Sequence, residues 1–338
     1  MRYLKLVFLT LGLLLLGLVV RDLNVDEVFA QIAEVGVIGM TFVVLFYAPV
    51  FAADAAGWQL ILTSVPRDLR WLARLFNIRL AGEAFNTVTP LGSMGGEPLK
   101  ALLLKSRYGI GYRESSVSLI LAKTIILIAL VLFLTIGFLL LLPSGRVSSA
   151  YKFIAGAGLI ALTLSIAGCF VIQRLRLSSR LGSWLGRIFG ARVTGRLQRL
   201  ILLIHDIDER LVHFYTEHRA RSVAAFLLAL LSWIGGVIEV YVVMWLLGYP
   251  VTFNEAWIIE ALVQLVRAGT FFIPASIGAQ EGTLVMVCSA MTGNPAVGLA
   301  LSVIRRVREV VWIAAGIAVW WIYSLNRTNP KESEREVV

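Results

Sequence analysis

Long apolar runs dominate this sequence and decide its fold class. The stretch from Ile125 to Leu142 holds no charged side chain, and an apolar segment of about 18 residues or more is typical of a helix that crosses a bilayer. Of the 338 residues, 58% are hydrophobic and only 15% are charged, whereas soluble domains carry about 25% charged residues. We therefore expect an all-α, multi-pass membrane protein.

The apolar runs predict six transmembrane helices, at about 3–20, 37–62, 115–142, 153–173, 222–247 and 296–323. Residues 174–221 contain ten Arg and only four acidic residues, and Lys and Arg prefer the cytoplasmic side of a membrane protein. This bias predicts cytoplasmic termini, an amphipathic cytoplasmic loop at 174–221 and a polar, disordered tail at 324–338. Residues 1–323 would form a single integral membrane domain.

Two polar segments interrupt this pattern, one after the second predicted helix and one after the fifth. In each, a proline precedes a glutamate by seven residues, as Pro90 precedes Glu97 and Pro274 precedes Glu281. Irregular backbone is tolerated at membrane depth only where it is buried in protein or lines a wet cavity. We interpret the two segments as re-entrant helical hairpins, broken at the prolines.

The hairpins divide the membrane domain into two related halves, at about 37–142 and 222–323. Charge counting opens the first hairpin to the cytoplasm and the second to the outside, so the halves would form an inverted repeat. In secondary transporters with such repeats, the substrate lies near the bilayer midplane between broken helices. The sequence therefore predicts a polar midplane cavity.

Ionisable residues inside the predicted helices and hairpins are the first candidate site residues, because each is costly in hydrocarbon and is usually functional. Lys123 follows Pro90 by 33 residues and Arg306 follows Pro274 by 32, so each half delivers a cation to an equivalent place. Converging cations suit a phosphate or carboxylate. The charged candidates are Asp54, Glu83, Glu97, Lys100, Lys123, Glu260, Arg267, Glu281, Arg305, Arg306, Arg308 and Glu309. Gly92, Gly95, Gly96 and Gly278 would let the backbone approach a ligand closely.

The same charges could instead pair with one another and hold the hairpins in place, because a lone buried charge is far costlier than a paired one. The pairs expected on that interpretation are Glu83 with Arg267 or Lys123, Glu281 with Arg305 or Arg306, and Arg308 with Glu309. Asp54 would then only cap a helix break. The residues alone leave the two interpretations open.

Several other classes of function lack a matching pattern. His205, His213 and His218 have no neighbouring Cys and no i,i+4 spacing, so we expect no metal site, and no phosphate-binding loop points to a cofactor. The two cysteines lie in apolar segments and predict no disulfide framework. The net charge of +10 indicates contact with anionic lipid head groups, not with nucleic acid.

The hairpin sequences resemble a known family. Residues 86–97, Asn-Thr-Val-Thr-Pro-Leu-Gly-Ser-Met-Gly-Gly-Glu, resemble the Asn-x-x-x-Pro-x-Gly-x-x-Gly-Gly-Glu pattern of the lysylphosphatidylglycerol synthase transmembrane (flippase-like) family. Residues 274–281, Pro-Ala-Ser-Ile-Gly-Ala-Gln-Glu, look like its second motif, Pro-x-x-x-Gly-x-x-Glu, and Arg305 or Arg306 falls where its last Arg would lie.

By that resemblance, the site-forming positions would be Asn86, Pro90, Gly95, Gly96, Glu97, Pro274, Gly278 and Glu281, and Gln280 inside the second motif joins them as a candidate. The resemblance implies a lipid translocase in the cytoplasmic membrane of a bacterium. The chain lacks the soluble aminoacyl-transfer domain of the full synthase, so we expect it not to make a lysyl lipid by itself.

The leading hypothesis is therefore a flippase that moves an anionic or zwitterionic lipid between leaflets, without enzymatic activity of its own. One alternative is a membrane enzyme that acts on a lipid head group, with Glu97 and Glu281 as acid and base. Another is a non-transporting anchor that holds a lipid-synthesis enzyme through the loop 174–221. Fold-level likeness does not fix a substrate.

Overall fold

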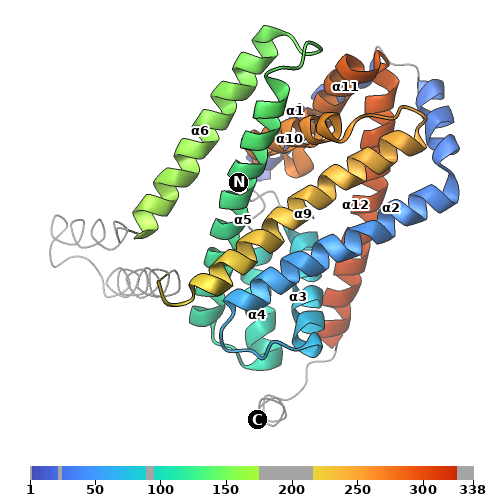
Figure 1. Ribbon diagram of the computed structural model, residues 1–338. Helices are drawn as coiled ribbons and strands as arrows, with labels where there is room; N and C mark the ends of the chain where they lie inside the picture. The colour runs from blue at the N-terminus through green and yellow to red at the C-terminus, as the bar shows by residue number, and fades with distance from the viewer. Residues whose placement is uncertain (1, 22–24, 89–94, 175–215, 326–338) are drawn as a thin grey trace.

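The computed structural model describes residues 2–21, 25–88, 95–174 and 216–325, and Figure 1 shows a bundle of long and short helices. The helices of the first part are α1 (Arg2–Arg21), α2 (Val25–Ile61), α3 (Leu69–Val88), α4 (Gly96–Tyr108), α5 (Tyr112–Leu141) and α6 (Ser149–Arg174). The second part holds α9 (Arg219–Leu246), α10 (Phe253–Gly269), the 3-10 turn η2 (Pro274–Ser276), α11 (Ala279–Thr292) and α12 (Pro295–Leu325).

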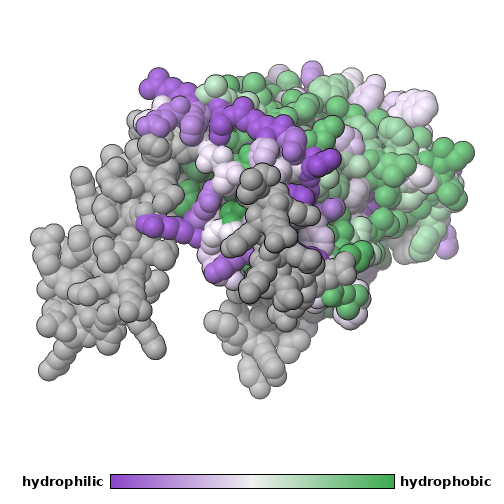
Figure 2. Space-filling view, turned by 90° about the horizontal axis from the view of Figure 1, so that it is seen from below, coloured by the Kyte–Doolittle hydropathy of each residue, from purple (hydrophilic) through white to green (hydrophobic). Residues whose placement is uncertain are grey.

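Five helices in the described ranges are long and apolar enough to cross a membrane: α2, α5, α6, α9 and α12. They correspond to the second to sixth predicted spans, and the first predicted span is α1. Seen from below in Figure 2, hydrophilic residues gather on part of this end of the bundle and hydrophobic residues cover the adjoining flank. The prediction of a multi-pass α-helical membrane protein is confirmed, and the orientation of its termini stays a prediction.

Each predicted hairpin is a pair of packed, shorter helices. The first pair is α3 with α4 and the second is α10 with α11, and Figure 1 places the two pairs at opposite ends of the bundle. The second pair is interrupted between Gly269 and Ala279, where Pro274 opens η2. In the first pair α3 ends at Val88 and α4 begins at Gly96, and Pro90 and Gly92 lie outside the described residues. Re-entry of either pair into a membrane stays a prediction.

The helix contacts follow a twofold pattern in which α2, α3, α4 and α5 correspond to α9, α10, α11 and α12. Helix α3 packs on α12 as α10 packs on α5, and α4 packs on α5 as α11 packs on α12. At the centre α2 packs along α9, its own counterpart. Two duplicated units of the kind predicted would give this pattern. It brings the helices of both halves around one interior space.

Small residues allow the closest helix approaches, as is common between helices in membranes. A β-carbon on Gly96 would lie 1.9 Å from the backbone oxygen of Gly82, so α4 rests directly on the backbone of α3. A β-carbon on Gly316 of α12 would lie 2.4 Å from the backbone oxygen of Leu80 in α3, so these two helices also pack closely. These contacts fix α3 between α4 and α12, and thereby place the polar face of α3 toward the interior.

Candidate functional site

A charged cavity of about 220 Å³ lies where the two halves meet. Its walls come from α2, α3, α4, α5, α9, α10 and α12. The acids on its walls are Asp54, Glu83, Glu97, Glu239 and Glu260, and the bases are Arg79, Lys100, Lys123, Arg267, Arg305 and Arg308. We name it the charged cavity. Such a concentration of ionisable groups inside a membrane protein is typical of a substrate or ion path.

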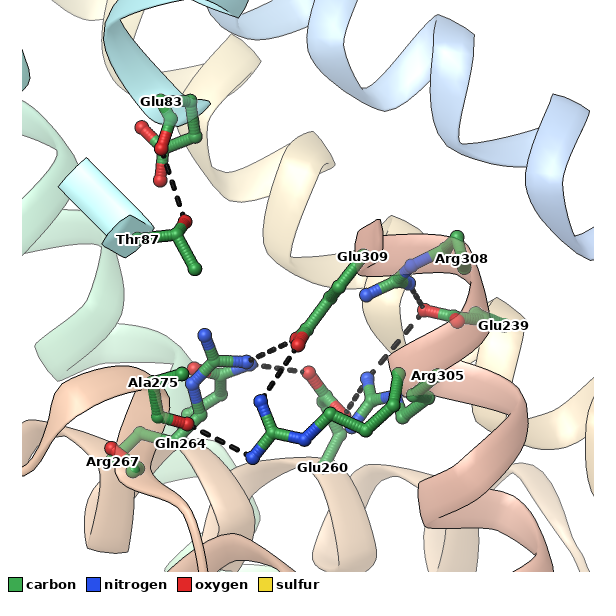
Figure 3. A network of polar contacts seen from close by, with 12 residues as sticks. Glu83, Thr87, Glu239, Glu260, Gln264, Arg267, Ala275, Arg305, Arg308 and Glu309 are labelled. Atoms are coloured by element: carbon green, nitrogen blue, oxygen red, sulfur yellow. Dashed lines mark hydrogen bonds and ion pairs between the residues drawn. The ribbon is translucent and has the colours of Figure 1, made fainter. Parts of the chain in front are cut away.

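Four of the residues that line the charged cavity form a buried ion network. Arg305 donates to Glu260 at 2.5 Å and lies 3.5 Å from Glu239, which also accepts from Arg308. All four side chains are buried, and Figure 3 shows them joining α9, α10 and α12. Because two acids face two bases, the network is neutral as a unit, which is what makes its burial tolerable.

A second network surrounds Arg306 and holds the break between α10 and α11. The guanidinium of Arg306 donates to Glu281 at 2.8 Å, to Glu309 at 2.8 Å and to the backbone oxygen of Ala275 at 2.9 Å. Arg267 reaches the same Glu309 at 3.3 Å (Figure 3). A fork of several donors in fixed directions is the particular property of arginine. Arg306 therefore acts as a clamp between α12 and the break.

The clamped backbone is strained. Ala275 and Ser276 have φ values of 51° and 49°, a left-handed region that costs non-glycine residues about 1–3 kcal/mol each and persists only where surrounding contacts impose it. The hydroxyl of Thr270 bonds that of Ser276 at 3.1 Å, and the Gly278 N–H donates to Glu281 at 2.7 Å. Together with the clamp, these bonds hold the break in one shape.

We expect Arg306→Gln to loosen this break while leaving the helices formed. A glutamine cannot reach three acceptors with charge-assisted bonds, so the strained turn loses what holds it. Hydrogen exchange of the amides of residues 270–278 should become several-fold faster than in the wild type. Arg113→Gln, at the exposed start of α5, is the matched control, and unchanged exchange in Arg306→Gln would contradict the clamp.

In the first half, the polar residues of the hairpin bond mainly to one another. Lys100 pairs with Glu97 at 2.9 Å, and Arg79 pairs with Asp54 of α2. Asn86 accepts from the Gly96 N–H at 2.7 Å and donates to Glu83 at 3.3 Å. Asn86 is thus the link between the end of α3 and the start of α4.

Lys123 differs from the other cations of the charged cavity. Its side chain is exposed and lines the cavity from α5. The other five bases on the walls each pair with a carboxylate, but Lys123 has no ion pair or hydrogen bond with the residues that the structure describes. Glu83 lines the same cavity, and its carboxylate accepts only from the Asn86 amide within those residues. Lys123, Lys100 and Arg79 all act electrostatically on Glu83, but no base makes an ion pair with Glu83 at contact distance among the described residues. Lys123 and Glu83 therefore keep the donor and acceptor sites that a ligand could bind.

The structure separates the predicted site residues into two groups. Those on the walls of the charged cavity are Glu83, Glu97, Lys100, Lys123, Arg267 and Arg305. Those away from its walls are Asn86, Gly95, Gly96, Gly278, Gln280, Glu281 and Arg306. Gly96 approaches the backbone of α3, so we assign it to helix packing. Gly278 precedes α11 with a φ of 82°, so we assign it to the turn that starts that helix. Pro90 lies outside the described residues.

The predicted charge pairs had mixed outcomes. The pair of Glu281 with Arg306 is confirmed. The local pair of Arg308 with Glu309 is wrong, because neighbours in a helix point in different directions; Arg308 bonds Glu239, and Glu309 bonds Arg306 and Arg267. Of the two cations predicted at equivalent places, Lys123 lines the charged cavity and Arg306 does not; their equivalence stays a prediction. The predicted pair of Glu83 with Arg267 or Lys123 is not formed at contact distance among the described residues, where Arg267 pairs with Glu309.

Sequence reasoning missed Glu239, which completes the buried network. Its signal was present, because a single acid in the middle of an otherwise apolar helix deserves the same attention as the acids of the hairpins. Tyr47 was also missed; its ring lies 4.0 Å from the Arg308 guanidinium and lines the cavity. Gln264, which donates to Glu260 at 2.7 Å, gave no signal separable from an ordinary polar helix residue.

The acid–base pair of the enzyme alternative is not brought together on the cavity. Glu97 lies on its wall, paired with Lys100. Glu281 is away from the wall and is bonded by Arg306 and by the Gly278 N–H. The loop of the anchor alternative lies outside the described residues over 175–215.

The chain is similar to known membrane proteins over nearly its whole length. Residues 4–317 match the family described as lysylphosphatidylglycerol synthase TM region. A UPF0104 membrane protein of Methanothermobacter thermautotrophicus is 23% identical over 324 residues, which covers 92% of this chain and 93% of that protein. Because the family match spans nearly the whole chain, the earlier resemblance is confirmed. This chain belongs to the family of the transmembrane region of lysylphosphatidylglycerol synthase.

Proposed function

We propose that this protein moves an anionic or zwitterionic lipid between the leaflets of its membrane by passing the head group through the charged cavity. The observation that carries the proposal is Lys123, a cation on the cavity wall that makes no ion pair at contact distance with a carboxylate of the described residues. Membership in a lipid-related membrane family supports the choice of a lipid as the substrate.

The cost of crossing hydrocarbon explains why a lipid would need such a cavity. A charged group placed alone at the bilayer centre costs at least about 2.5–3.5 kcal/mol, and by some estimates much more. Inside the cavity, the phosphate of a head group would face Lys123, and an amine on the same head group would face Glu83. Each group then exchanges water for an opposite charge, which lowers the barrier.

The size of the cavity suits a head group better than a whole lipid. Its volume of about 220 Å³ lies below the roughly 300–1,000 Å³ of pockets that enclose drug-sized ligands. Acyl chains need no such shelter, because the surrounding lipid is as apolar as they are. We therefore propose that the chains stay in the bilayer while the head group moves.

The proposal is tested by replacing Lys123 in protein reconstituted into liposomes of phosphatidylcholine with fluorescent phosphatidylglycerol. We expect Lys123→Gln to slow lipid movement about tenfold, since the loss of about 1.4 kcal/mol of interaction corresponds to a factor of ten. The measurement is dithionite quenching of the fluorescent lipid that reaches the outer leaflet.

The matched control is Lys105→Gln, because Lys105 is an exposed lysine of α4 away from the cavity walls. It should move lipid at the wild-type rate. Equal rates in protein-free and protein-containing vesicles, across anionic and zwitterionic lipids, would overturn the proposed function. A wild-type rate in Lys123→Gln would overturn the role given to Lys123.

A further inference from the structure

A second cavity lies on the other side of α10, and it is larger than the charged cavity and mainly apolar. It is a groove of about 910 Å³ between α5, α6, α10 and α11. Its walls are almost entirely apolar or small, for example Leu127, Gly158, Leu162 and Leu265. In Figure 1, α6 stands on the outer side of α5, where it forms the outer wall of the groove.

Helix α10 separates the two cavities by its two faces. Glu260, Gln264 and Arg267 turn to the charged cavity. Leu262, Leu265, Val266 and Gly269 line the apolar groove. The polar face of α10 lines the charged cavity and its apolar face lines the groove. The groove is therefore separate from the site already described.

One end of the groove is basic. Arg146, in the turn between α5 and α6, lines this end with Ser148 and Tyr151. Lys152 lies at the same turn, where its ammonium donates to the backbone oxygens of Leu142 at 2.8 Å and Ser144 at 2.6 Å. Arg146 donates to the backbone oxygen of Met291 at 2.6 Å. Only one carboxylate, Glu255, pairs with these two bases in the described part of the chain, at 2.8 Å from Arg146. The turn thus keeps a net positive charge.

The length of the groove matches the depth of a bilayer. The wall on this side extends from Ser148, just before α6, to Ile166, a separation of 18 positions, or about 27 Å at about 1.5 Å per residue. The hydrocarbon core of a bilayer is about 30 Å thick. The basic end would therefore lie near the head groups of one leaflet, with the apolar walls running down beside the acyl chains.

We infer that this groove binds a bilayer phospholipid, with its phosphate at the Arg146–Lys152 turn and an acyl chain along α6. An unfilled groove would forfeit the dispersion contacts of its walls. Since acyl chains gain no hydrophobic energy by leaving other lipid, selectivity comes from the phosphate at the basic turn. The site requires only that the protein lies in a membrane and does not rest on the proposed transport.

The test uses the full-length protein in phosphatidylcholine vesicles that contain phosphatidylglycerol with a photoreactive acyl chain. After irradiation, mass spectrometry should find the label on the groove-facing residues of α6, α10 and α11. Phosphatidylcholine with the same photoreactive chain should label them several-fold less. Replacing both bases, Arg146→Gln with Lys152→Gln, should abolish this difference between the two lipids.

Filling the groove supplies the matched comparison. Ala161 and Ala157 are both exposed on α6, but only Ala161 lines the groove. Ala161→Trp should reduce the labelling several-fold, and Ala157→Trp should not. Ser165→Trp, a second exposed groove position, gives an independent variant if Ala161→Trp does not yield folded protein by gel filtration.

Three results would overturn this inference: labelling spread evenly around α6, equal labelling by the two lipids in the wild type, or crosslinks showing a second copy or another segment of this chain in the groove. Specific labelling without lipid movement would support the groove and count against the proposed transport. Lipid movement without specific labelling would do the reverse.

Discussion

Glu239→Gln is expected to destabilise the fold by about 3–5 kcal/mol, the range measured when one partner of a buried ion pair is removed. Glu239 is the carboxylate that Arg308 bonds in the buried network, and Arg305 keeps Glu260 as its own partner. The substitution therefore leaves the Arg308 guanidinium buried without its ion-pair partner, against the Tyr47 ring. Unfolding by SDS, followed by tryptophan fluorescence, measures the change in the free energy of unfolding.

The control for this experiment is Glu34→Gln, because Glu34 is exposed on α2 and surface substitutions usually change stability by less than about 0.5 kcal/mol. A double substitution sharpens the test. Removing the stranded charge as well, with Arg308→Met in the Glu239→Gln protein, should restore much of the stability, because apolar residues can replace a buried ion pair without loss. A single substitution as stable as Glu34→Gln would show that Arg308 has another source of compensation.

Gly96→Val is the second substitution with a large expected effect. A β-carbon at this position would lie 1.9 Å from the Gly82 backbone oxygen and 2.9 Å from the Asn86 side-chain oxygen. Because a backbone atom cannot rotate aside as a side chain can, α4 must move away from α3. We expect a loss of about 3 kcal/mol, the upper end of the usual 1–3 kcal/mol for overpacking.

Displacement of α4 also moves Glu97 and Lys100 on the wall of the charged cavity. Gly96→Val should therefore lose lipid movement together with stability, both measured on reconstituted protein. Gly168→Ala is the control, since nothing lies within 4 Å of a β-carbon there and alanine favours a helix over glycine by about 0.5–1 kcal/mol. A stable and active Gly96→Val protein would contradict the close packing of the two helices.

The long helices could be predicted from the sequence because a charge-free run inside a membrane protein has few alternatives to a helix. The predicted 115–142 segment, for example, is α5, Tyr112–Leu141. Helix α2 begins at Val25, before the predicted start at about residue 37. Hydropathy locates only the apolar part of a helix, and residues 25–36 are its more polar first part. Gly36, with φ of 63° inside α2, interrupts the helix where the polar part meets the apolar part.

The ion pairs could not be predicted to the same degree, since their partners come from distant helices. Arg308 and Glu239 are 69 residues apart, and Arg305 and Glu260 are 45 apart. A sequence shows which buried charges need partners, but only the packing of α9, α10 and α12 decides which acid each base meets. Sequence neighbours therefore suggested an ion pair of Arg308 with Glu309, but in the structure each pairs with a different residue.

The twofold packing and the unequal charges of the two halves together limit how the molecule can rearrange. If the predicted correspondence of Lys123 with Arg306 holds, Lys123 would take the part of Arg306 in a conformation where the halves exchanged arrangements. An ammonium cannot make the three directed bonds by which Arg306 holds Glu281, Glu309 and Ala275. The exchanged form would lack the three bonds of this clamp. The two conformations would therefore differ in free energy, and the protein would favour the one that keeps the clamp.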